Sequence, residues 1–226
     1  MAAERTDAGR ATGPDYSEIG ERLRARRHEL GWSLRELADR LGVSPSLISQ
    51  IERGRARPSV STLFALVSEL DASLDELLFN DERSASPSSA TSAAEARFSP
   101  VQEAATRHHI RLASGVVWER LTTTSQPGVE FLFVVYDVGG ASSEGGTYQS
   151  HAGYEWGYVI SGLLEVIIGF ERYVLQPGDA VSLDSGVPHR LANIGDTPVH
   201  AIWFVLGRDA DPRLLGQVSS PSSPPR

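Results

Sequence analysis

The chain has 226 residues, enough for two small domains that each bury a core. It contains no cysteine, so disulfides, thiolate metal sites and cysteine nucleophiles are excluded. The formal net charge is −8, but residues 1–59 hold 11 Arg against 9 acidic residues (+2), and the remainder holds 10 Arg against 20 acidic residues (−10). A local Arg cluster in an acidic chain indicates a protein that binds specific sites on a nucleic acid. It argues against a protein that covers nucleic acid without sequence preference.

No apolar run reaches the roughly 18 to 20 residues that span a membrane, and the run from Phe131 to Tyr136 is among the longest. The first residues include Glu4, Arg5 and Asp7 and no apolar core, so no secretory signal is predicted there. We therefore expect a soluble, cytoplasmic protein without a membrane partner.

Residues 1–14 are predicted to form a disordered arm, and helical periodicity begins at Asp15. Asp15 and Glu18 form a capping box for a helix that extends to Gly31. Its apolar face holds Ile19, Leu23 and Leu30. Its solvent-exposed face is predicted to carry Arg22, Arg24, Arg26 and Arg27.

Two short helices joined by a tight turn are predicted over residues 33–55. The first begins with the capping box Ser33-x-x-Glu36 and continues with an apolar stripe at i, i+3, i+4 and i+7. Gly42 ends it in a left-handed conformation, and Ser44 followed by Pro45 supplies the N-cap and first position of the next helix. The apolar residues of the second helix are few, which leaves a polar outer face.

Pro58 breaks the chain after this unit, and two further helices are predicted. Apolar residues of the fourth are Val60, Leu63, Phe64, Val67 and Leu70. Ser73 and Glu76 form a capping box for the fifth, whose apolar residues are Leu74, Leu77 and Leu78. We therefore predict an all-α domain of five helices over residues 15–80.

Residues 81–98 are rich in Ser and Ala and predict a flexible linker that lets two domains reorient. Beyond it, period-2 patterns separated by Gly, Pro and Asp turns predict an all-β sandwich or barrel over residues 99–207. The nine predicted strands are residues 108–112, 115–121, 129–138, 155–161, 163–168, 172–175, 180–183, 189–193 and 199–205. Residues 208–226 are predicted to form a disordered tail.

The pattern over residues 16–79 resembles the helix-turn-helix of the Xre/lambda-repressor-like family of DNA-binding proteins. The resemblance implies that the second helix of the pair enters the major groove. It places base-facing positions at Ser44, Ser46, Ser49 and Gln50, and phosphate-contacting positions at Arg35, Arg53, Arg55 and Arg57. Gln50 is the most specific, since its amide can pair bidentately with adenine. The alternative is an ordinary pair of packed helices with a solvated face.

The order of turns and polar residues over residues 101–206 resembles the cupin family of small β-barrels. The first family motif corresponds to Gln149-x-His151-x3-Glu155-x6-Gly162. The second corresponds to Pro177-Gly178-Asp179 followed by Gly186-Val187-Pro188-His189 and Asn193. In metal-bearing cupins three His and one Glu of these motifs bind a divalent ion. Here Gln149 stands in place of the first His, and Ser143 in place of the leading Gly.

This resemblance implies that His151, Glu155 and His189 are metal ligands, with Gln149 as a weak fourth. Two His and one carboxylate suit non-haem iron, and Zn, Mn or Ni are compatible. The alternative is that these groups hydrogen-bond to each other or to an organic ligand without a metal. The aromatic residues of the domain either line a small-molecule pocket or belong to the core: Tyr148, Trp156, Tyr158, Trp203 and Phe204.

Together these features predict a homodimeric transcriptional regulator. Its cupin domain is expected to bind a small-molecule effector, to modulate binding to a double-stranded DNA operator, and to supply the dimer contact. No catalytic residue and no required cofactor is predicted. The alternative is a mononuclear non-haem iron enzyme similar to hydroxyalkylphosphonate epoxidases, in which the helical domain shapes the active site.

Overall fold

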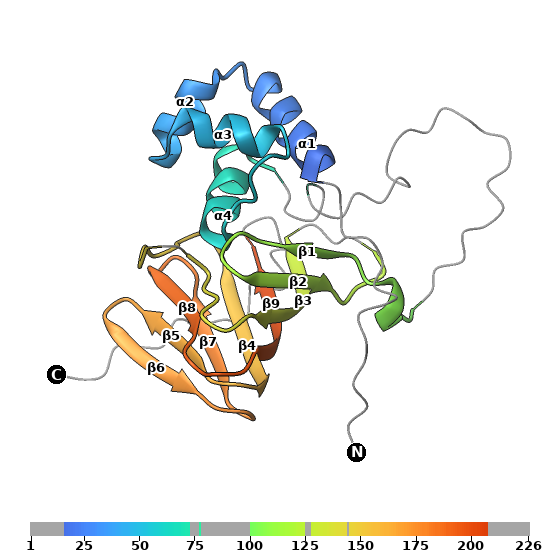
Figure 1. Ribbon diagram of the computed structural model, residues 1–226, viewed down its shortest axis with the longest axis vertical. Helices are drawn as coiled ribbons and strands as arrows, with labels where there is room; N and C mark the ends of the chain where they lie inside the picture. The colour runs from blue at the N-terminus through green and yellow to red at the C-terminus, as the bar shows by residue number, and fades with distance from the viewer. Residues whose placement is uncertain (1–15, 73–76, 78–99, 125–127, 144, 208–226) are drawn as a thin grey trace, which may run out of the picture.

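The computed structural model describes residues 16–72, 77, 100–124, 128–143 and 145–207. Within them the chain forms a helical domain that lies on one side of a β domain (Figure 1). No helix in these residues is long and apolar enough to cross a membrane.

The described residues contain four α-helices rather than the five that we predict. They are α1 (Tyr16–Glu29), α2 (Leu34–Leu41), α3 (Pro45–Glu52) and α4 (Val60–Glu69). The predicted fifth helix, from Ser73, lies outside the described residues except for Leu77, which is buried in the hydrophobic core. Asp15, the predicted N-cap of α1, also lies outside them.

The predicted turn between α2 and α3 is confirmed in detail. Ser33 and Glu36 form the reciprocal capping box at the start of α2, and Gly42 ends that helix at φ 65°. The Ser44 side chain accepts a hydrogen bond from the Leu47 amide at 3.2 Å, and Pro45 occupies the first turn of α3. The local sequence therefore fixes how α3 leaves α2.

The prediction that Arg27 lies on the exposed face of α1 is wrong. Arg27 is only 4% exposed and forms two hydrogen bonds with Glu52 of α3, at 2.6 Å from Nε and 2.8 Å from Nη2. Its Nη1 also donates to the Trp32 carbonyl at 2.7 Å. Arg27 lies four residues after Leu23, on the same face of the helix, and that face packs against α3. A buried ion pair therefore joins α1 to α3.

All nine predicted strands are present. They are β1 (His109–Arg111), β2 (Val116–Arg120), β3 (Val129–Tyr136), β4 (Tyr154–Ser161), β5 (Leu164–Ile168), β6 (Glu171–Leu175), β7 (Ala180–Asp184), β8 (His189–Asn193) and β9 (Val199–Leu206). A short 3-10 helix, Ala104–Thr106, precedes β1.

The strands form two antiparallel sheets, one of six strands in the order β1-β2-β3-β9-β4-β7 and one of three in the order β6-β5-β8. In the described part of the chain no ladder closes these sheets into the predicted barrel, although single bridges join Ala141 to Ala192 and Gln149 to His189. Much of the interior is apolar, and alternate residues such as Val134, Val159 and Ala201 are almost fully buried.

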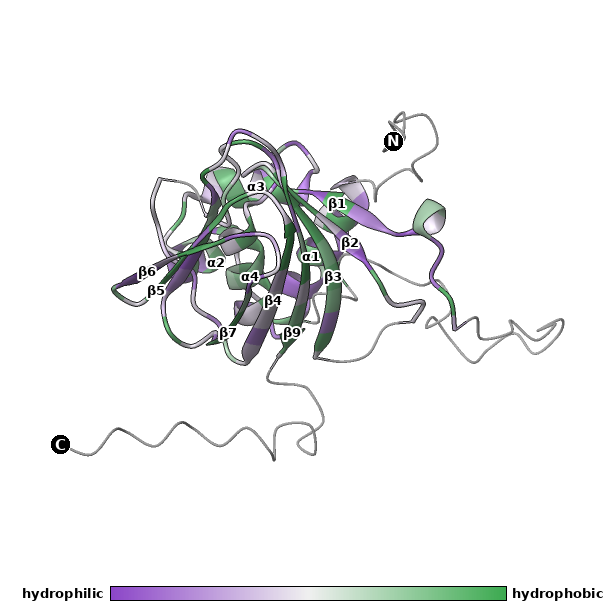
Figure 2. Ribbon diagram, turned by 90° about the horizontal axis from the view of Figure 1, so that it is seen from below, coloured by the Kyte–Doolittle hydropathy of each residue, from purple (hydrophilic) through white to green (hydrophobic). Residues whose placement is uncertain are grey.

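The aromatic residues of the large sheet divide between its two faces. Trp203 is 5% exposed and faces the interior. Its neighbour Phe204 points the opposite way and lies between Phe131 of β3 and Trp156 of β4, with ring centroids 6.3 and 5.7 Å away. Figure 2 shows β3, β9 and β4 side by side, with many hydrophobic residues.

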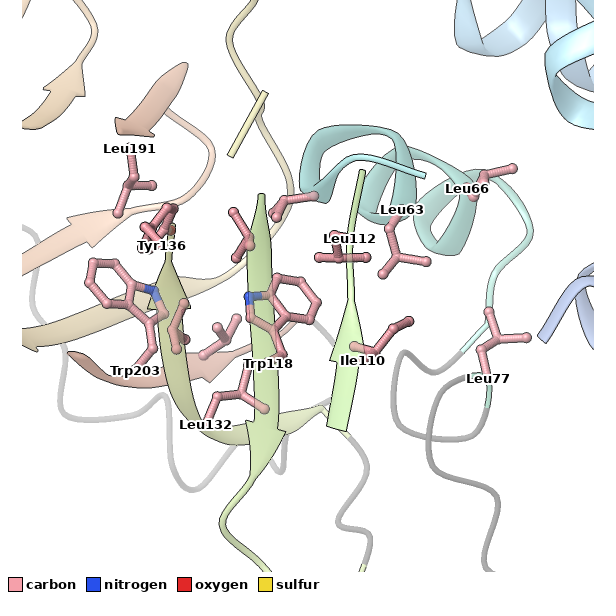
Figure 3. Close-up of a cluster of buried hydrophobic side chains, with 14 of the residues drawn as sticks. Leu63, Leu66, Leu77, Ile110, Leu112, Trp118, Leu132, Tyr136, Leu191 and Trp203 are labelled. Carbon is pink, nitrogen blue, oxygen red and sulfur yellow. The ribbon is translucent and has the colours of Figure 1, made fainter. Parts of the chain in front are cut away.

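Helix α4 packs directly against the β domain. The Ser61 amide donates to the Ser142 carbonyl at 2.9 Å, and the Ala113 amide donates to the Pro58 carbonyl at 3.0 Å. Buried side chains of α4 and of the strands belong to one hydrophobic cluster (Figure 3). The predicted linker over residues 81–98 lies outside the described residues. The two domains nevertheless touch, which the composition of that linker did not predict.

Replacing Glu52 by Ala should lower the free energy of unfolding by about 3–5 kcal/mol, because it leaves the buried Arg27 guanidinium without its countercharge. Urea denaturation followed by circular dichroism measures this change. Glu18→Ala is the matched control, since that carboxylate contacts Arg22 at 3.6 Å on the surface and its loss should change stability little. Equal effects of the two substitutions would contradict the importance of the buried pair.

Candidate nucleic-acid interface and interior site

The outer face of α3 is polar and open to solvent. Ser44, Ser46 and Gln50 are exposed, and Ser49 is half-buried. The Gln50 amide nitrogen lies 3.5 Å from the Ser46 hydroxyl, a long hydrogen bond that leaves the amide free to pair elsewhere. The apolar residues of the helix point inward, and Ile48 and Ile51 are at most 2% exposed. Helix α3 thus presents hydrogen-bonding groups on its free side.

Four exposed arginines accompany this face. Arg35 lies in α2, and Arg53, Arg55 and Arg57 follow α3. Arg53 Nε donates to the Ser49 carbonyl at 3.0 Å, and the Arg57 guanidinium lies 5.0 Å from the centre of the Tyr16 ring. All eight residues predicted to contact DNA therefore lie in or beside the helix-turn-helix, and cations flank the polar face.

Gly54 is part of this geometry, although the sequence did not single it out. Its φ is 65°, and a Cβ there would lie 2.7 Å from the Ser17 amide nitrogen. Only glycine fits both the left-handed backbone and the close approach to α1. The turn between Arg53 and Arg55 therefore depends on this position.

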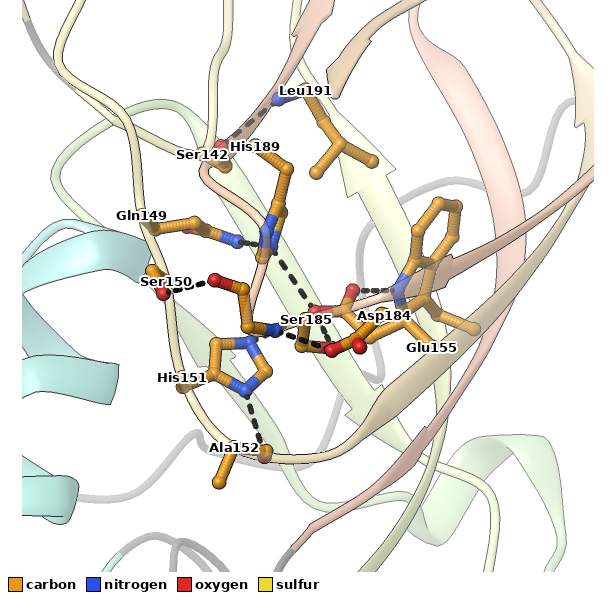
Figure 4. Close-up of polar contacts among 12 residues, drawn as sticks. Ser142, Gln149, Ser150, His151, Ala152, Glu155, Asp184, Ser185, His189 and Leu191 are labelled. Atoms are coloured by element: carbon orange, nitrogen blue, oxygen red, sulfur yellow. Dashed lines mark hydrogen bonds and ion pairs between the residues drawn. The ribbon is translucent and has the colours of Figure 1, made fainter. Parts of the chain in front are cut away.

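The second cluster lies inside the β domain, where the structure brings all four predicted ligands together (Figure 4). His151 Nε2 lies 2.8 Å from Glu155 Oε1, and His189 Nε2 lies 3.2 Å from the same oxygen. Gln149 Nε2 lies 3.0 Å from His189 Nε2. Glu155 comes from β4, His189 begins β8, and the other two residues precede β4.

Two further donors hold the Glu155 carboxylate. The Ser185 hydroxyl donates to Oε1 at 3.1 Å, and the Trp203 indole donates to Oε2 at 2.6 Å. Burial raises the pKa of Glu155, but the hydrogen bonds and charges of His151 and His189 outweigh it and hold that pKa well below its usual range. Burial alone would lower the pKa of His189. The hydrogen bond and charge of Glu155 outweigh burial, so the pKa of His189 is raised. The carboxylate is therefore ionised inside an apolar domain.

The cluster has the chemistry of a site for a divalent ion. One ligand atom from each of His151, Glu155 and His189 lies within 4.8 Å of the others. His189 Nδ1 lies 2.9 Å from the Val187 carbonyl, which orients the ring and leaves Nε2 for a ligand. Gln149 Oε1 is buried without a hydrogen-bond partner in the described structure. Two imidazoles, a carboxylate and an amide oxygen fit a first-row transition metal.

The cluster borders a small cavity whose walls come from both domains. Its lining residues are Val60, Phe64, Trp118, Leu132, Val134, Tyr136, Gln149, Glu155, Leu191, Trp203 and Val205. Of the aromatic residues that we considered for a pocket, only Trp203 is among them. Phe64 of α4 stacks on His151 with ring centroids 4.1 Å apart and planes 10° apart. It also meets the Trp118 ring edge to face at 5.6 Å.

The sequence missed Phe64, Trp118 and Tyr136 as cavity residues. Phe64 lies four residues after Val60 on the apolar stripe of α4, a pattern typical of an ordinary helical core residue. No local signal distinguishes a side chain that packs within its own domain from one that reaches a neighbouring domain.

Comparison with known proteins agrees with this architecture. Residues 23–77 match the helix-turn-helix family HTH_3, and residues 132–205 match the cupin domain family Cupin_2. The HTH-type transcriptional regulator PuuR of Escherichia coli (strain K12) is 27% identical over 83% of this chain and 90% of its own length. The HTH-type transcriptional regulator SutR of the same strain is 28% identical over 79% of this chain and 88% of its own length.

A crystal structure of an HTH_3 family transcriptional regulator from Vibrio cholerae superposes with a TM-score of 0.59 at 22% identity, covering 85% of this chain and 96% of that one. This likeness shows the fold alone. The names of the two curated relatives favour a DNA-binding regulator and weaken the enzyme alternative.

Proposed function

Because the chain joins a helix-turn-helix domain to a C-terminal cupin domain, we propose that it is a sequence-specific transcriptional regulator whose cupin domain binds a small-molecule effector and modulates operator binding. The observation that carries the DNA-binding part is the exposed polar face of α3 with arginines beside it. The observation that carries modulation is the shared wall of the cavity, since α4 belongs to the DNA-binding domain.

In this proposal α3 enters the major groove. Gln50 and Ser46 face base edges, and Ser44 and Ser49 lie beside them. Arg35, Arg53, Arg55 and Arg57 neutralise phosphates on either side and fix the register of the helix. The acidic remainder of the chain limits nonspecific attraction, so the specific contacts dominate the choice of site.

We also propose that His151, Glu155 and His189 hold a divalent metal ion, and that the Gln149 amide oxygen stays free as an acceptor beside it. When bound, the ion supplies a Lewis-acidic centre at the polar end of the cavity. Trp203 and Ser185 keep the Glu155 carboxylate in place through their hydrogen bonds.

We propose a homodimer in which the outer face of β3, β9 and β4 meets the same face of a second copy. This face carries Phe131, Trp156 and Tyr158, and Tyr158 is 49% exposed. Two chains of net charge −8 repel, but the cross-strand rows Phe131–Phe204–Trp156 and Phe133–Ile202–Tyr158 contain no charged residue. The tail that follows β9, residues 208–226, has only Leu214, Leu215 and Val218 as large apolar residues and four prolines, a poor composition for covering a sheet.

Binding-site selection from a random DNA pool, followed by titration of the selected site, tests the recognition helix. Gln50→Ala should change the preferred base at one position and cost about 1–3 kcal/mol on the parent site. Arg53→Ala should weaken binding to all sequences. It should also reduce by about 1 the slope of the logarithm of the binding constant against the logarithm of the salt concentration. Arg172→Ala, which removes an exposed arginine from β6, is the control and should leave both unchanged. If Gln50→Ala and Arg53→Ala both bound the selected site like the parent chain, the assignment of α3 as the recognition helix would be wrong.

The metal proposal predicts that the purified chain binds one Co²⁺ per molecule, seen by its visible absorption and by calorimetry. His189→Ala should abolish this binding, because it removes one of three strong ligands. His109→Ala is the control, since that residue lies in β1 and outside the cluster. Equal Co²⁺ binding by the parent and the His189 variant would contradict the site.

Light scattering coupled to gel filtration tests the dimer. The parent chain should have about twice its 24.4 kDa mass, and Phe131→Glu should be monomeric because it places a charge within the contact. Phe170→Glu makes the same change at a fully exposed turn between β5 and β6 and should stay dimeric. A monomeric parent, or a dimeric Phe131 variant, would overturn this contact.

A further inference from the structure

The interior cavity is nearly filled. Its volume is about 20 Å³, room for a single water molecule or an ion. An organic effector is much larger, so the site that the proposed function requires is closed in this structure. Part of the wall has to move before such a molecule binds.

The strand side of the wall is the rigid side. Leu132, Val134 and Val205 belong to the hydrogen-bonded β3–β9 ladder and are at most 4% exposed. Moving them would break a sheet whose pairing runs through eight residues of each strand. The wall therefore opens elsewhere.

Helix α4 forms the other side of the wall. It contributes Val60 and Phe64, the two described lining residues that come from the helical domain. Phe64 is half-buried, whereas the neighbouring helix residue Leu63 is fully buried within the core. The Phe64 ring fills the space between His151 and Trp118, with centroids 4.1 and 5.6 Å away.

We propose that the Phe64 ring occupies the place of the effector, so that effector binding displaces Phe64 and shifts α4. This inference rests on the proposed function, because it names how the cavity of the cupin domain is linked to the DNA-binding domain. The ligand that replaces a phenyl ring stacked on an imidazole is itself flat and apolar over most of its surface.

The polar end of the ligand follows from an unpaired acceptor. Gln149 is 5% exposed, lines the cavity, and its Oε1 has no hydrogen-bond partner in the described structure. A buried acceptor without a partner is costly, and a ligand N–H or O–H removes that cost. The chemical class is therefore a small aromatic or heteroaromatic molecule with one hydrogen-bond donor.

A shift of α4 reaches the DNA-binding surface through the helical core. Leu63 and Leu66 of α4 are at most 1% exposed and belong to the same cluster as Leu37 and Ile48 of the helix-turn-helix. The bonds of Ser61 to Ser142 and of Pro58 to Ala113 hold α4 in the closed position. A coupling of this kind typically changes affinity about 5- to 150-fold.

Indole, which is flat and has one N–H, is the probe. Ligand-observed NMR should show that Phe64→Ala binds indole at least about tenfold more tightly than the parent chain, because the space is already free. Benzofuran, which lacks the N–H, should bind this variant more weakly than indole does. Phe170→Ala removes the same ring from an exposed turn and should behave like the parent. Equal indole binding by the parent and Phe64→Ala would overturn the inference.

Phe64→Leu is the second variant, since it keeps apolar volume in the core but removes the flat ring. Its affinity for indole should lie between those of the parent and Phe64→Ala. If the Ala variant does not fold, the comparison of Phe64→Leu with the parent tests the role of Phe64. Titration of the selected DNA site separates a failure of the proposed function from a failure of the role of Phe64. If the parent chain shows no specific DNA binding, the proposed function is wrong. Intact DNA binding with indole affinity independent of residue 64 would refute only the role of Phe64.

Discussion

The stacked contact between Phe64 and His151 joins the two domains of this protein. Helix α4 belongs to both, because successive residues of an α-helix point about 100° apart. Leu63 faces the helical core and Phe64 faces the cavity of the β domain. Helix α4 therefore connects the helix-turn-helix domain to the interior polar cluster.

The interior cluster places charged groups beside a mostly apolar wall. Glu155 stays ionised because His151, His189, Ser185 and Trp203 all hold its oxygens. The cavity beside this cluster has room for an ion, whereas we propose that a larger molecule displaces Phe64. In this proposal an ion leaves α4 in place, and only the larger molecule moves it.

Much of this structure follows from the sequence, and the reasons are local. The capping box of Ser33 and Glu36, the left-handed Gly42 and the N-cap Ser44 act within a few residues of chain, so the turn before α3 was predictable. Strand positions were predictable because alternation and turn residues are also local. The clustering of His151, Glu155 and His189 was predictable from a family motif.

The features that the sequence did not predict depend on partners far along the chain. In the sequence, Arg27 has the charge typical of a surface residue. In the structure it is buried because Glu52 of α3 supplies the countercharge. Adjacent strand residues such as Trp203 and Phe204 point to opposite faces of the sheet, but which of them faces the interior depends on the neighbouring strands. Phe64 fits the stripe of its own helix equally well whether it packs inside one domain or between two.

Helix α4 holds the helical domain against the β domain through the bond of Ser61 to Ser142 and the stack of Phe64 on His151. The chain has no cysteine, so Arg24→Cys on α1 and Tyr173→Cys on β6, both exposed, provide a unique pair of spin labels. Pulsed electron–electron double resonance then measures the distance between the domains. A single narrow distance distribution is the result that the shared helix predicts. A broad distance distribution, as expected for two domains joined only by a flexible linker, would contradict this packing.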